Sequence, residues 1–376
     1  MRKTILIILA MIMVVGLTSC GGNSNGKLFV TDYDVEDYCE EAIIVSKSDG
    51  KVYGVLDNKG KEIFSLEYDD IEFINKDEYV DEKCDSLYIC TEYEGEYTVY
   101  DLGKKEIIKS EKSIYSIDYK LEDKTEDAPI FKSANKLYDK NGNEKMSLPE
   151  GIYISQLTRF ISGKCCLIPK EDKVFLCGFN IKDYNGNNIG SIDNATLLYE
   201  CVYENMYYIG CELANGADDE SPIYKMYVIN SDGAFVEERE LPSSYELQSE
   251  ITEIKNRNKD ENKAFKLYKS NSTWKLEDFE GNNLYEERYY EKLIPNGEND
   301  CVALTNEDDE LCIIGHQGTK YIDFGVLKYD DDEEEVFMLI GKDTEIQIDE
   351  IFEGKNSIII PVQSEEGKII YCFSGK

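Results

Sequence analysis

The sequence predicts an all-β protein in which one four-stranded unit is repeated along the chain. From residue 27 onward, short runs of Val, Ile, Leu, Tyr and Phe alternate with clusters of Gly, Asn, Asp and Lys, and no long stretch shows a helical period. A turn of the form Asp/Asn-x-x-Gly also recurs, with 37 to 48 residues between successive closing glycines. That spacing fits a four-stranded blade, so we predict a β-propeller of seven or eight blades. Paired β-sandwiches are the alternative.

Residues 1–19 have the anatomy of a secretory signal peptide. Arg2 and Lys3 form a basic start, and the run from Ile5 to Leu17 is apolar and interrupted only by Gly16. This run is shorter than the roughly 20 apolar residues that a spanning helix needs. We therefore expect the segment to be removed and the mature protein to lie outside the cytoplasm.

The end of this segment, Leu17-Thr18-Ser19-Cys20, resembles the bacterial lipobox. The resemblance implies that the Cys20 thiol receives a diacylglyceryl group and that Cys20 begins the mature chain; an ordinary secretory signal is the alternative. Two acyl chains anchor a protein stably where one does so only marginally. We thus predict lipid anchoring at the extracytoplasmic face of a bacterial membrane. Residues 20–26 are read as a flexible Gly-rich tether and residues 27–376 as a single propeller domain.

Each copy of the repeated turn predicts one β-hairpin. Its first Asp or Asn caps the turn with the side chain, and its last Gly adopts the left-handed conformation that closes the hairpin with a bulge. The clear copies are Asp57 to Gly60, Asp139 to Gly142, Asp183 to Gly186, Asn230 to Gly233 and Asp278 to Gly281. Gly315 to Gly318 and a shortened turn, Asp101-Leu102-Gly103, are weaker copies.

The two ends of the chain look like two halves of one such hairpin. The last apolar run is Ile369 to Phe373, and the mature chain begins with Gly26 to Val30. We therefore predict that the N- and C-terminal strands pair and close the ring. Closure would also remove the exposed sheet edge that an open array presents.

Residues 51–71 are similar to one unit of the WG-repeat family of bacterial β-propeller-like proteins. The similarity rests on Tyr53-Gly54, on the turn from Asp57 to Gly60, and on Tyr68-Asp69. A partial second copy contains Trp274, and elsewhere the similarity is one of spacing. In no other copy does Gly directly follow the aromatic residue. The resemblance implies binding or scaffolding more often than catalysis.

The charge balance excludes several partners. The chain has 77 Asp and Glu against 41 Lys and Arg, a net charge of -36. Such a chain repels nucleic-acid phosphates and anionic lipid surfaces, so we expect no nucleic-acid partner and no electrostatic membrane attachment. We expect a monomer.

Eleven cysteines follow Cys20, and none forms a Cys-x-x-Cys pair, which argues against a zinc site. Most lie in apolar runs and are predicted to be buried thiols. The pair to examine for a disulfide is Cys39 with Cys372, because ring closure would bring the chain ends together. Cys165 and Cys166 should point to opposite faces of one strand.

No residue pattern points to catalysis. The single histidine, His316, falls in a predicted turn without a nucleophile motif, so we predict that it is exposed and assign no catalytic residue. The acidic runs 218–220, 308–310 and 330–335 are interpreted as solvated loops. Calcium, bound by their oxygen atoms, is the alternative, and no other cofactor is expected.

Together these observations predict a non-catalytic, lipid-anchored protein of the cell envelope. Its rigid repeats would form a scaffold that binds an extracytoplasmic protein or glycan. One alternative is a propeller hydrolase or lyase that acts on polysaccharide with Asp, Glu and Tyr side chains. Another is a calcium-dependent structural module.

Overall fold

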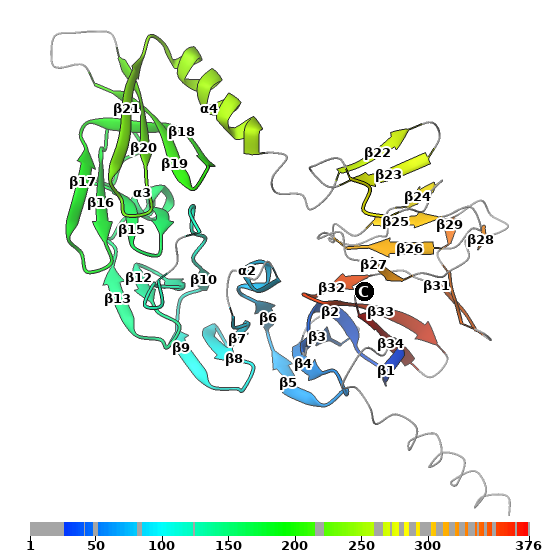
Figure 1. The fold of residues 1–376 in the computed structure, drawn as a ribbon. Coiled ribbons are helices and arrows are strands. Elements are labelled where there is room, and N and C mark those ends of the chain that lie inside the picture. The colour runs from blue at the N-terminus through cyan, green and yellow to red at the C-terminus, as the bar shows by residue number, and fades with distance from the viewer. Residues whose placement is uncertain are drawn as a thin grey trace, which may run out of the picture.

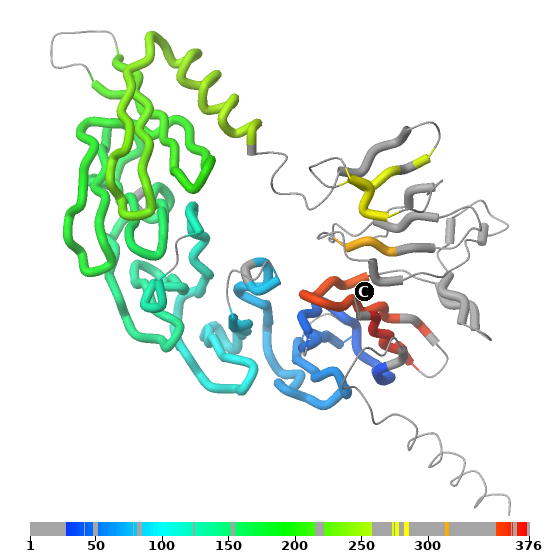
Figure 2. The backbone as a smooth tube through the Cα atoms, viewed as in Figure 1, coloured from blue at the N-terminus to red at the C-terminus, as the bar shows by residue number. Residues whose placement is uncertain are grey.

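The computed structural model of the protein describes most of the chain between residues 26 and 374 (Figure 2). The described residues are 26–40, 42–47, 52–80, 85–122, 125–214, 222–258, 266–270, 273–277, 282–285, 291–293, 302–305, 311–315, 320–322, 328–329, 335–336, 338–341, 344–347, 351–364 and 367–374. The predicted signal peptide and Cys20 lie outside them.

Six antiparallel sheets of four strands, named here blades A to F, follow one another along an arc (Figure 1). Blade A contains β32 (Phe352–Glu353), β33 (Ser357–Ser364), β34 (Gly367–Ser374) and β1 (Gly26–Thr31). Blade B contains β2 (Asp34–Cys39), β3 (Ala42–Ser46), β4 (Tyr53–Asp57) and β5 (Glu62–Tyr68). Blade C contains β6 (Asp70–Phe73), β7 (Tyr88–Tyr93), β8 (Glu96–Asp101) and β9 (Glu106–Ser110).

The remaining blades of the arc have the same up-and-down order. Blade D contains β10 (Ile114–Ser116), β11 (Phe131–Ser133), β12 (Lys136–Tyr138) and β13 (Glu144–Ser147). Blade E contains β14 (Arg159–Ser162), β15 (Cys165–Pro169), β16 (Phe179–Asp183) and β17 (Asn188–Ile192). Blade F contains β18 (Ala195–Tyr203), β19 (Met206–Leu213), β20 (Ile223–Ile229) and β21 (Phe235–Leu241).

A seventh four-stranded sheet and three hairpins lie between blade F and blade A in the sequence. The sheet contains β24 (Glu291–Leu293), β25 (Val302–Thr305), β26 (Leu311–Ile314) and β27 (Lys320–Ile322). The hairpins are β22 (Lys266–Ser270) with β23 (Thr273–Glu277), β28 (Lys328–Tyr329) with β29 (Glu335–Val336), and β30 (Met338–Gly341) with β31 (Thr344–Gln347). Successive four-stranded meanders of this kind define a β-propeller, which confirms the predicted fold class.

Blade A is built from both ends of the chain. β1 pairs antiparallel with β34, from Gly26 opposite Cys372 to Thr31 opposite Lys368, and Figure 2 shows the blue strand beside the red ones. The C-terminal segment thus supplies three strands and the N-terminal segment supplies the fourth. The predicted pairing of the terminal strands is confirmed.

Neighbouring blades share hydrophobic cores, so the stacking of sheets is the main packing interaction. Between blades E and F, for example, Phe179 and Ile181 pack with Tyr207 and Ile209, all of them fully buried. Similar cores lie between A and B, B and C, C and D, and D and E. Middle strands are therefore buried on both faces, as in β3 and β15, where every residue is buried. This explains why their sequences are continuous apolar runs rather than alternating ones.

Every described copy of the repeated turn joins the third and fourth strands of a blade. In the turn from Asp57 to Gly60, the Asp57 carboxylate accepts hydrogen bonds from the backbone amides of Lys59 (2.8 Å) and Lys61 (2.9 Å). The Gly60 amide donates to the Asp57 carbonyl (2.9 Å). The turns that begin at Asp139, Asp183 and Asn230 repeat this pattern. The turn predicted at 278–281 lies outside the described residues, as does most of the one at 315–318.

The turn after β8 is full-length, so the prediction of a shortened Asp101-Leu102-Gly103 turn is wrong. Lys104 holds the closing position, with φ of +67°, and its amide donates to the Asp101 carbonyl (2.9 Å). The Lys105 amide bonds the Asp101 carboxylate (2.9 Å). A lysine therefore occupies the left-handed position that glycine holds in the other copies, and a search for glycine placed the end of this turn one residue early.

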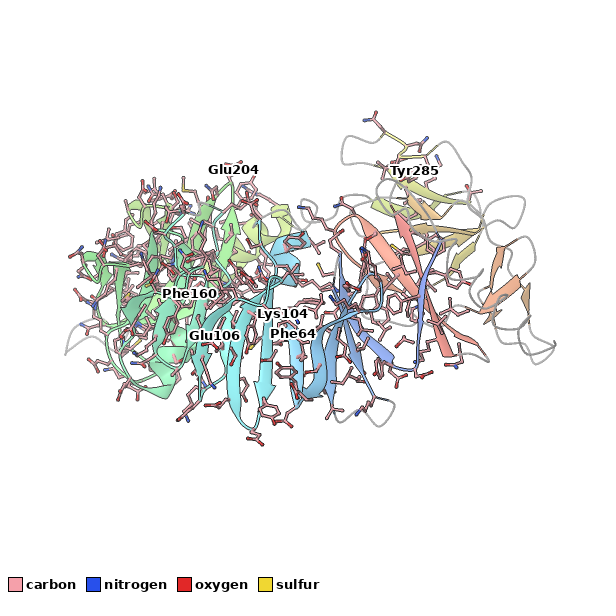
Figure 3. The ribbon with its side chains drawn as sticks, turned by 90° about the horizontal axis from the view of Figure 1, so that it is seen from below. Phe64, Lys104, Glu106, Phe160, Glu204 and Tyr285 are labelled. Carbon is pink, nitrogen blue, oxygen red and sulfur yellow. The ribbon has the colours of Figure 1, made fainter. Side chains whose placement is uncertain are left out.

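Several of these turns also dock on the preceding blade. A Cβ on Gly142 of blade D would lie 2.0 Å from the Ile107 carbonyl oxygen of blade C, and one on Gly60 of blade B would lie 2.9 Å from Phe29 of blade A. The Lys104 ammonium of blade C lies 5.7 Å from the centre of the Phe64 ring of blade B (Figure 3). The turn of one blade thus packs against the fourth strand of the preceding blade, and we call this recurring contact the interlock between blades.

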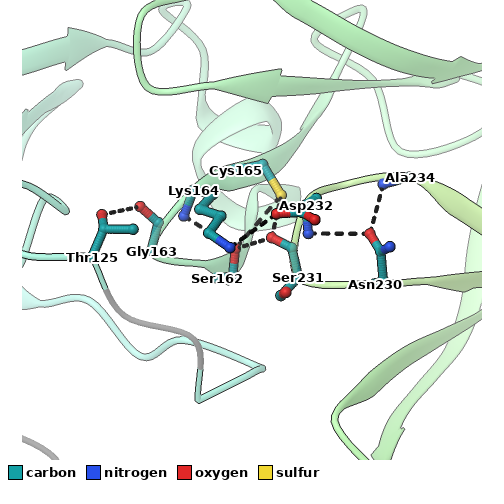
Figure 4. A network of polar contacts seen from close by, with 9 residues as sticks. All are labelled: Thr125, Ser162, Gly163, Lys164, Cys165, Asn230, Ser231, Asp232 and Ala234. Carbon is teal, nitrogen blue, oxygen red and sulfur yellow. Dashed lines mark hydrogen bonds and ion pairs between the residues drawn. The ribbon is translucent and has the colours of Figure 1, made fainter.

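The interlock of blade F with blade E adds polar bonds (Figure 4). The Ser162 hydroxyl lies 2.5 Å from the Ser231 carbonyl oxygen, to which it donates. The Lys164 ammonium forms an ion pair with Asp232 at 2.9 Å. One loop away, the Thr125 hydroxyl of blade D donates to the Gly163 carbonyl (3.0 Å). Three successive blades are therefore tied together on this face.

Three described helices interrupt the strands: α2 (Lys76–Val80), α3 (Ile152–Leu157) and α4 (Ser244–Asn258). The 15-residue α4 contradicts the expectation that no long stretch would be helical. Leu247, Ile251 and Ile254 of α4 pack on Met226 and other apolar residues of blade F. Because the opposite face of blade F packs on blade E, α4 covers the face on which a next blade would stack.

A local signal for α4 exists in the sequence. Ser243 caps the helix, with its hydroxyl 3.3 Å from the Glu246 amide, and Ser-x-x-Glu is the capping-box pattern. Glu253 and Arg257 add an ion pair one turn apart (2.8 Å). The short strand-like runs on either side of it led to a prediction of strands throughout this part of the chain. No helix within the described residues is long and apolar enough to cross a membrane.

Candidate functional site

Several residues singled out in the sequence lie outside the described residues. These are Cys20, His316, the acidic runs 218–220 and 308–310, and all but Glu335 of the run 330–335. Trp274 lies in β23. Within the described residues, no three His, Cys, Asp or Glu side chains gather closely enough to hold a metal ion.

Cys39 and Cys372, the pair to examine for a disulfide, are not bonded to each other, and both residues are thiols. Cys39 packs in the core between blades B and C, whereas Cys372 packs against the core between blades A and B. The two thiols therefore lie on opposite sides of blade B, although their strands belong to neighbouring blades. Instead, blades A and B are tied together by the Tyr38 and Ser357 hydroxyls, 2.6 Å apart and buried.

Most described cysteines behave as predicted, as buried thiols. Cys165 packs in the core between blades E and F and Cys166 in the core between D and E, which confirms that they point to opposite faces. Burial raises the pKa of Cys90 and of Cys211 to about 12. Thiols with such pKa values remain protonated at neutral pH and are poor nucleophiles.

The first and second strands of blades D, E and F carry a polar cluster that the sequence did not single out. It consists of Tyr115 on β10, Lys132 on β11, Arg159 on β14, and Glu200 and Tyr207 on β18 and β19. We call this set the inner-strand cluster, because β10 lies on the inner side of the arc while β13 and β17 lie on its outer side (Figure 1).

Arg159 and Glu200 form the centre of this cluster. The Arg159 Nε lies 2.8 Å and 3.1 Å from the two carboxylate oxygens of Glu200 on the neighbouring blade. The Arg159 Nη1 donates to the Gln156 carbonyl at the end of α3 (2.7 Å). The Tyr207 hydroxyl donates to the same carboxylate, and burial together with the Glu200 charge raises the pKa of Tyr207 well above its ordinary value. These contacts hold the Glu200 carboxylate as an acceptor in a fixed position.

Lys132 approaches the same end of α3 from blade D. Its ammonium donates to the Ser155 hydroxyl (2.9 Å), and no carboxylate of the described residues lies within ion-pair distance of it. Burial lowers the pKa of Lys132, with no opposing contribution from an acidic group. By contrast, carboxylate partners raise the pKa values of Lys109 and Lys136. In a chain of net charge -36, Lys132 is an ammonium left without a counter-ion.

Tyr115 is the exposed aromatic member of the cluster. It lies directly opposite Lys132 in the ladder between β10 and β11, so the two side chains stand on the same face of the sheet about 5 Å apart at Cβ. Its side chain is 60% exposed, unlike the buried Tyr207. The cluster therefore presents an aromatic ring beside an unneutralised ammonium. The Ser155 hydroxyl lies 2.9 Å from this ammonium, and the next residue of α3, Gln156, accepts the hydrogen bond from Arg159.

A second feature is an apolar loop tip between β15 and β16. Val174, Phe175 and Leu176 are all exposed, Phe175 at 72%. The tip is held firmly: the Leu176 amide donates to the Thr196 hydroxyl of β18 (2.8 Å), and the Gly178 amide donates to the Ala195 carbonyl (3.0 Å). Leu176 has φ of +51°, a conformation that a leucine rarely adopts.

Neither feature was predicted. The only signal for Arg159 was the scarcity of arginine, of which the chain has five, and the three-residue strands of blade D carry no distinctive pattern around Tyr115 or Lys132. The segment Val174-Phe175-Leu176 reads as the start of a strand, but the structure places it in the loop before β16.

Comparison with known proteins adds little beyond these observations. No family model and no curated protein matches the chain. Among solved structures, the β-propeller domain of the Trilobed protease from Pyrococcus furiosus, described as having an open velcro topology, is 11% identical, with 93% of this chain and 95% of that one covered and a TM-score of 0.25. Raptor from Chaetomium thermophilum is 12% identical, with 94% and 29% covered and a TM-score of 0.22. A eukaryotic initiation factor is 6% identical, with 93% and 90% covered and a TM-score of 0.22.

Likenesses this weak carry no functional argument, so the class of the protein rests on its own strand order. Blades of four antiparallel strands, one of them completed by both chain ends, make it a β-propeller. As an array of like blades it is a repeat scaffold.

Proposed function

We propose that this protein is a non-catalytic, lipid-anchored scaffold of the cell envelope that binds an extracytoplasmic partner. The observation that carries the binding role is the fixed apolar loop tip 174–176. An exposed phenylalanine between two exposed aliphatic residues, on a loop bonded to the next blade, is typical of an interaction surface. The unfavourable backbone of Leu176 supports this, because strain persists at sites where function holds it.

The inner-strand cluster favours binding over acid–base chemistry. Its carboxylate, Glu200, already accepts hydrogen bonds from Arg159 and Tyr207, so its oxygen atoms are engaged within the protein. A scaffold whose blades share cores and interlocking turns also has little freedom to rearrange. Preformed surfaces of this kind bind without a large ordering cost.

Lipid anchoring rests on the sequence resemblance at Cys20. In bacterial cells, Cys20→Ala should release the full-length chain from the membrane fraction and abolish incorporation of a labelled fatty acid. Retention of label in this variant would refute the anchoring.

Binding through the loop tip has its own test. A photo-crosslinking residue at position 175 of the full-length chain should give a discrete adduct with an envelope protein. The same residue at position 245 on α4 serves as the matched control, because Tyr245 is equally exposed, at 76%. With the crosslinking residue moved to a position beside the loop tip, Phe175→Ser should abolish the adduct. Tyr245→Ser should leave it unchanged. Identical adducts from both positions would refute a role for the loop.

A further inference from the structure

The ammonium of Lys132 is half-buried and meets no carboxylate among the described residues. Burying an ammonium is unfavourable unless a partner compensates it, and an acidic chain offers many partners. Lysines on strands of blades C and D give the contrast, because they meet carboxylates: Lys136 pairs with Glu144 and Lys109 with Glu96, both at 2.6 Å. Lys132 meets only a hydroxyl, that of Ser155. It is therefore placed to receive an anionic group from outside the chain.

The neighbours of Lys132 indicate what carries that anionic group. Tyr115 offers an exposed ring on the same face of blade D, and aromatic rings pack against the apolar faces of sugars. The Ser155 hydroxyl, 2.9 Å from the Lys132 ammonium, can donate to and accept from a sugar hydroxyl, and the Arg159–Glu200 pair follows beyond the end of α3. A ring for stacking, a cation for a charge and polar groups for hydroxyls are together complementary to a charged sugar.

Lys132 is the one cation of the cluster that has no carboxylate partner among the described residues, and this limits the charge of the ligand. Arg159 is already neutralised by Glu200, so the cluster as a whole can compensate one negative charge. A polyphosphate or a nucleic acid would bring several charges against a chain of net charge -36. A saccharide that carries a single carboxylate satisfies both conditions.

We infer that the inner-strand cluster, with Lys132 and Tyr115 at its centre, is a binding site for an acidic saccharide whose carboxylate pairs with the Lys132 ammonium. This inference rests on the proposed binding role, for which it names a ligand class. It does not depend on the lipid anchor or on the loop tip 174–176. Arg159 is a positioning residue, because it fixes Glu200 and the end of α3 instead of meeting the carboxylate.

The test compares three probes by calorimetry on the full-length chain in detergent: a short galactose oligosaccharide that ends in one galacturonate, the same oligosaccharide with galactose in that place, and a peptide that carries one carboxylate. The charged saccharide should bind at least about tenfold more tightly than the neutral one, as expected for one charge-assisted hydrogen bond. Lys132→Gln should remove this preference and leave binding of the neutral saccharide unchanged. Tyr115→Ala should weaken both saccharides, whereas Tyr115→Phe should retain them.

Lys109→Gln is the matched control, because Lys109 lies on β9, away from the cluster, and pairs with Glu96. It should leave all affinities unchanged. Lys132→Gln breaks no ion pair, so its melting temperature should match the parent and a loss of binding cannot come from misfolding. Equal binding of the charged and neutral saccharides, stronger binding of the peptide, no binding of either saccharide, or an unchanged Lys132→Gln variant would each overturn the inference. Loss of membrane anchoring in Cys20→Ala would leave these affinities unaffected.

Discussion

The interlock between turns and preceding blades predicts that two glycines in equivalent turns respond differently to the same substitution. Gly142 and Gly186 both close a turn in the left-handed region, with φ of +82° and +85°. An alanine at either position is strained by about 1–2 kcal/mol, because its Cβ approaches a backbone oxygen in that conformation. The loss of backbone freedom in the unfolded chain is also the same for both substitutions. These contributions cancel in a comparison of the two variants.

The surroundings of the two glycines differ. A Cβ at Gly142 would lie 2.0 Å from the Ile107 carbonyl oxygen of blade C, while nothing lies within 4 Å of one at Gly186. Because a backbone atom cannot move aside cheaply, blade D must shift from blade C, and overpacking of this kind costs about 1–3 kcal/mol. We expect Gly186→Ala to lower the free energy of unfolding by about 1–2 kcal/mol. Gly142→Ala should lower it by roughly 2–5 kcal/mol, the sum of both contributions.

Equilibrium urea unfolding of both variants measures this difference, and hydrogen exchange of the β9 and β13 amides locates it. Gly233→Ala gives an intermediate case, since its Cβ would meet side chains, Ile181 at 2.9 Å and the Cys165 sulfur at 3.1 Å, which can rotate or shift. An equal loss of stability in Gly142→Ala and Gly186→Ala would show that the glycines serve the turns alone. The reasoning about docking between blades would then be wrong.

Three further substitutions test other parts of the fold. Tyr38→Phe should lower stability by about 1–2 kcal/mol in urea unfolding, because the buried Ser357 hydroxyl loses its partner between blades A and B; an unchanged midpoint would contradict that role. Ser243→Ala should cost about 1 kcal/mol and reduce helical ellipticity through loss of the α4 cap, whereas Ser243→Asp should not. Burial opposes ionisation of Asp183, but hydrogen bonds from Asn187 and Asn185 outweigh it and hold its pKa below the ordinary value. Its contribution is thus present above the unfolded pKa and lost as pH falls through the lower folded pKa, so Asp183→Asn should flatten the acid limb of a stability–pH curve; an identical acid limb would exclude this contribution.

The local rules of turns and strands made much of the fold predictable. Asp57 and Gly60 act on atoms within four residues of each other, so their hydrogen bonds and backbone conformation follow from the sequence alone. Buried middle strands show as continuous apolar runs for the same reason. The pairing of the terminal strands was predicted because the two chain ends look like the two halves of one hairpin. The register from Gly26 to Thr31 confirms this pairing.

Local rules failed where a different residue served the same geometry. Lys104 replaced a glycine, and the search for glycine therefore misplaced the end of that turn. Local rules also failed at α4. Its helical pattern in the sequence is weak, and the helix is stabilised as much by packing of its apolar face on blade F. Cys39 and Cys372 do not pair, because neighbouring strands can direct their side chains into different cores.

The sequence by itself determined the repeating unit, its turns and the joining of the chain ends, since each depends on residues near one another or on a regular spacing. Only the tertiary structure decided which side chains meet between blades. Tyr115 and Lys132 come from one blade, and Arg159 and Glu200 from the next two, so no short stretch of sequence contains their arrangement. The absence of a carboxylate beside Lys132 is likewise a property of three-dimensional packing among the described residues, because the composition alone would have given that ammonium a partner.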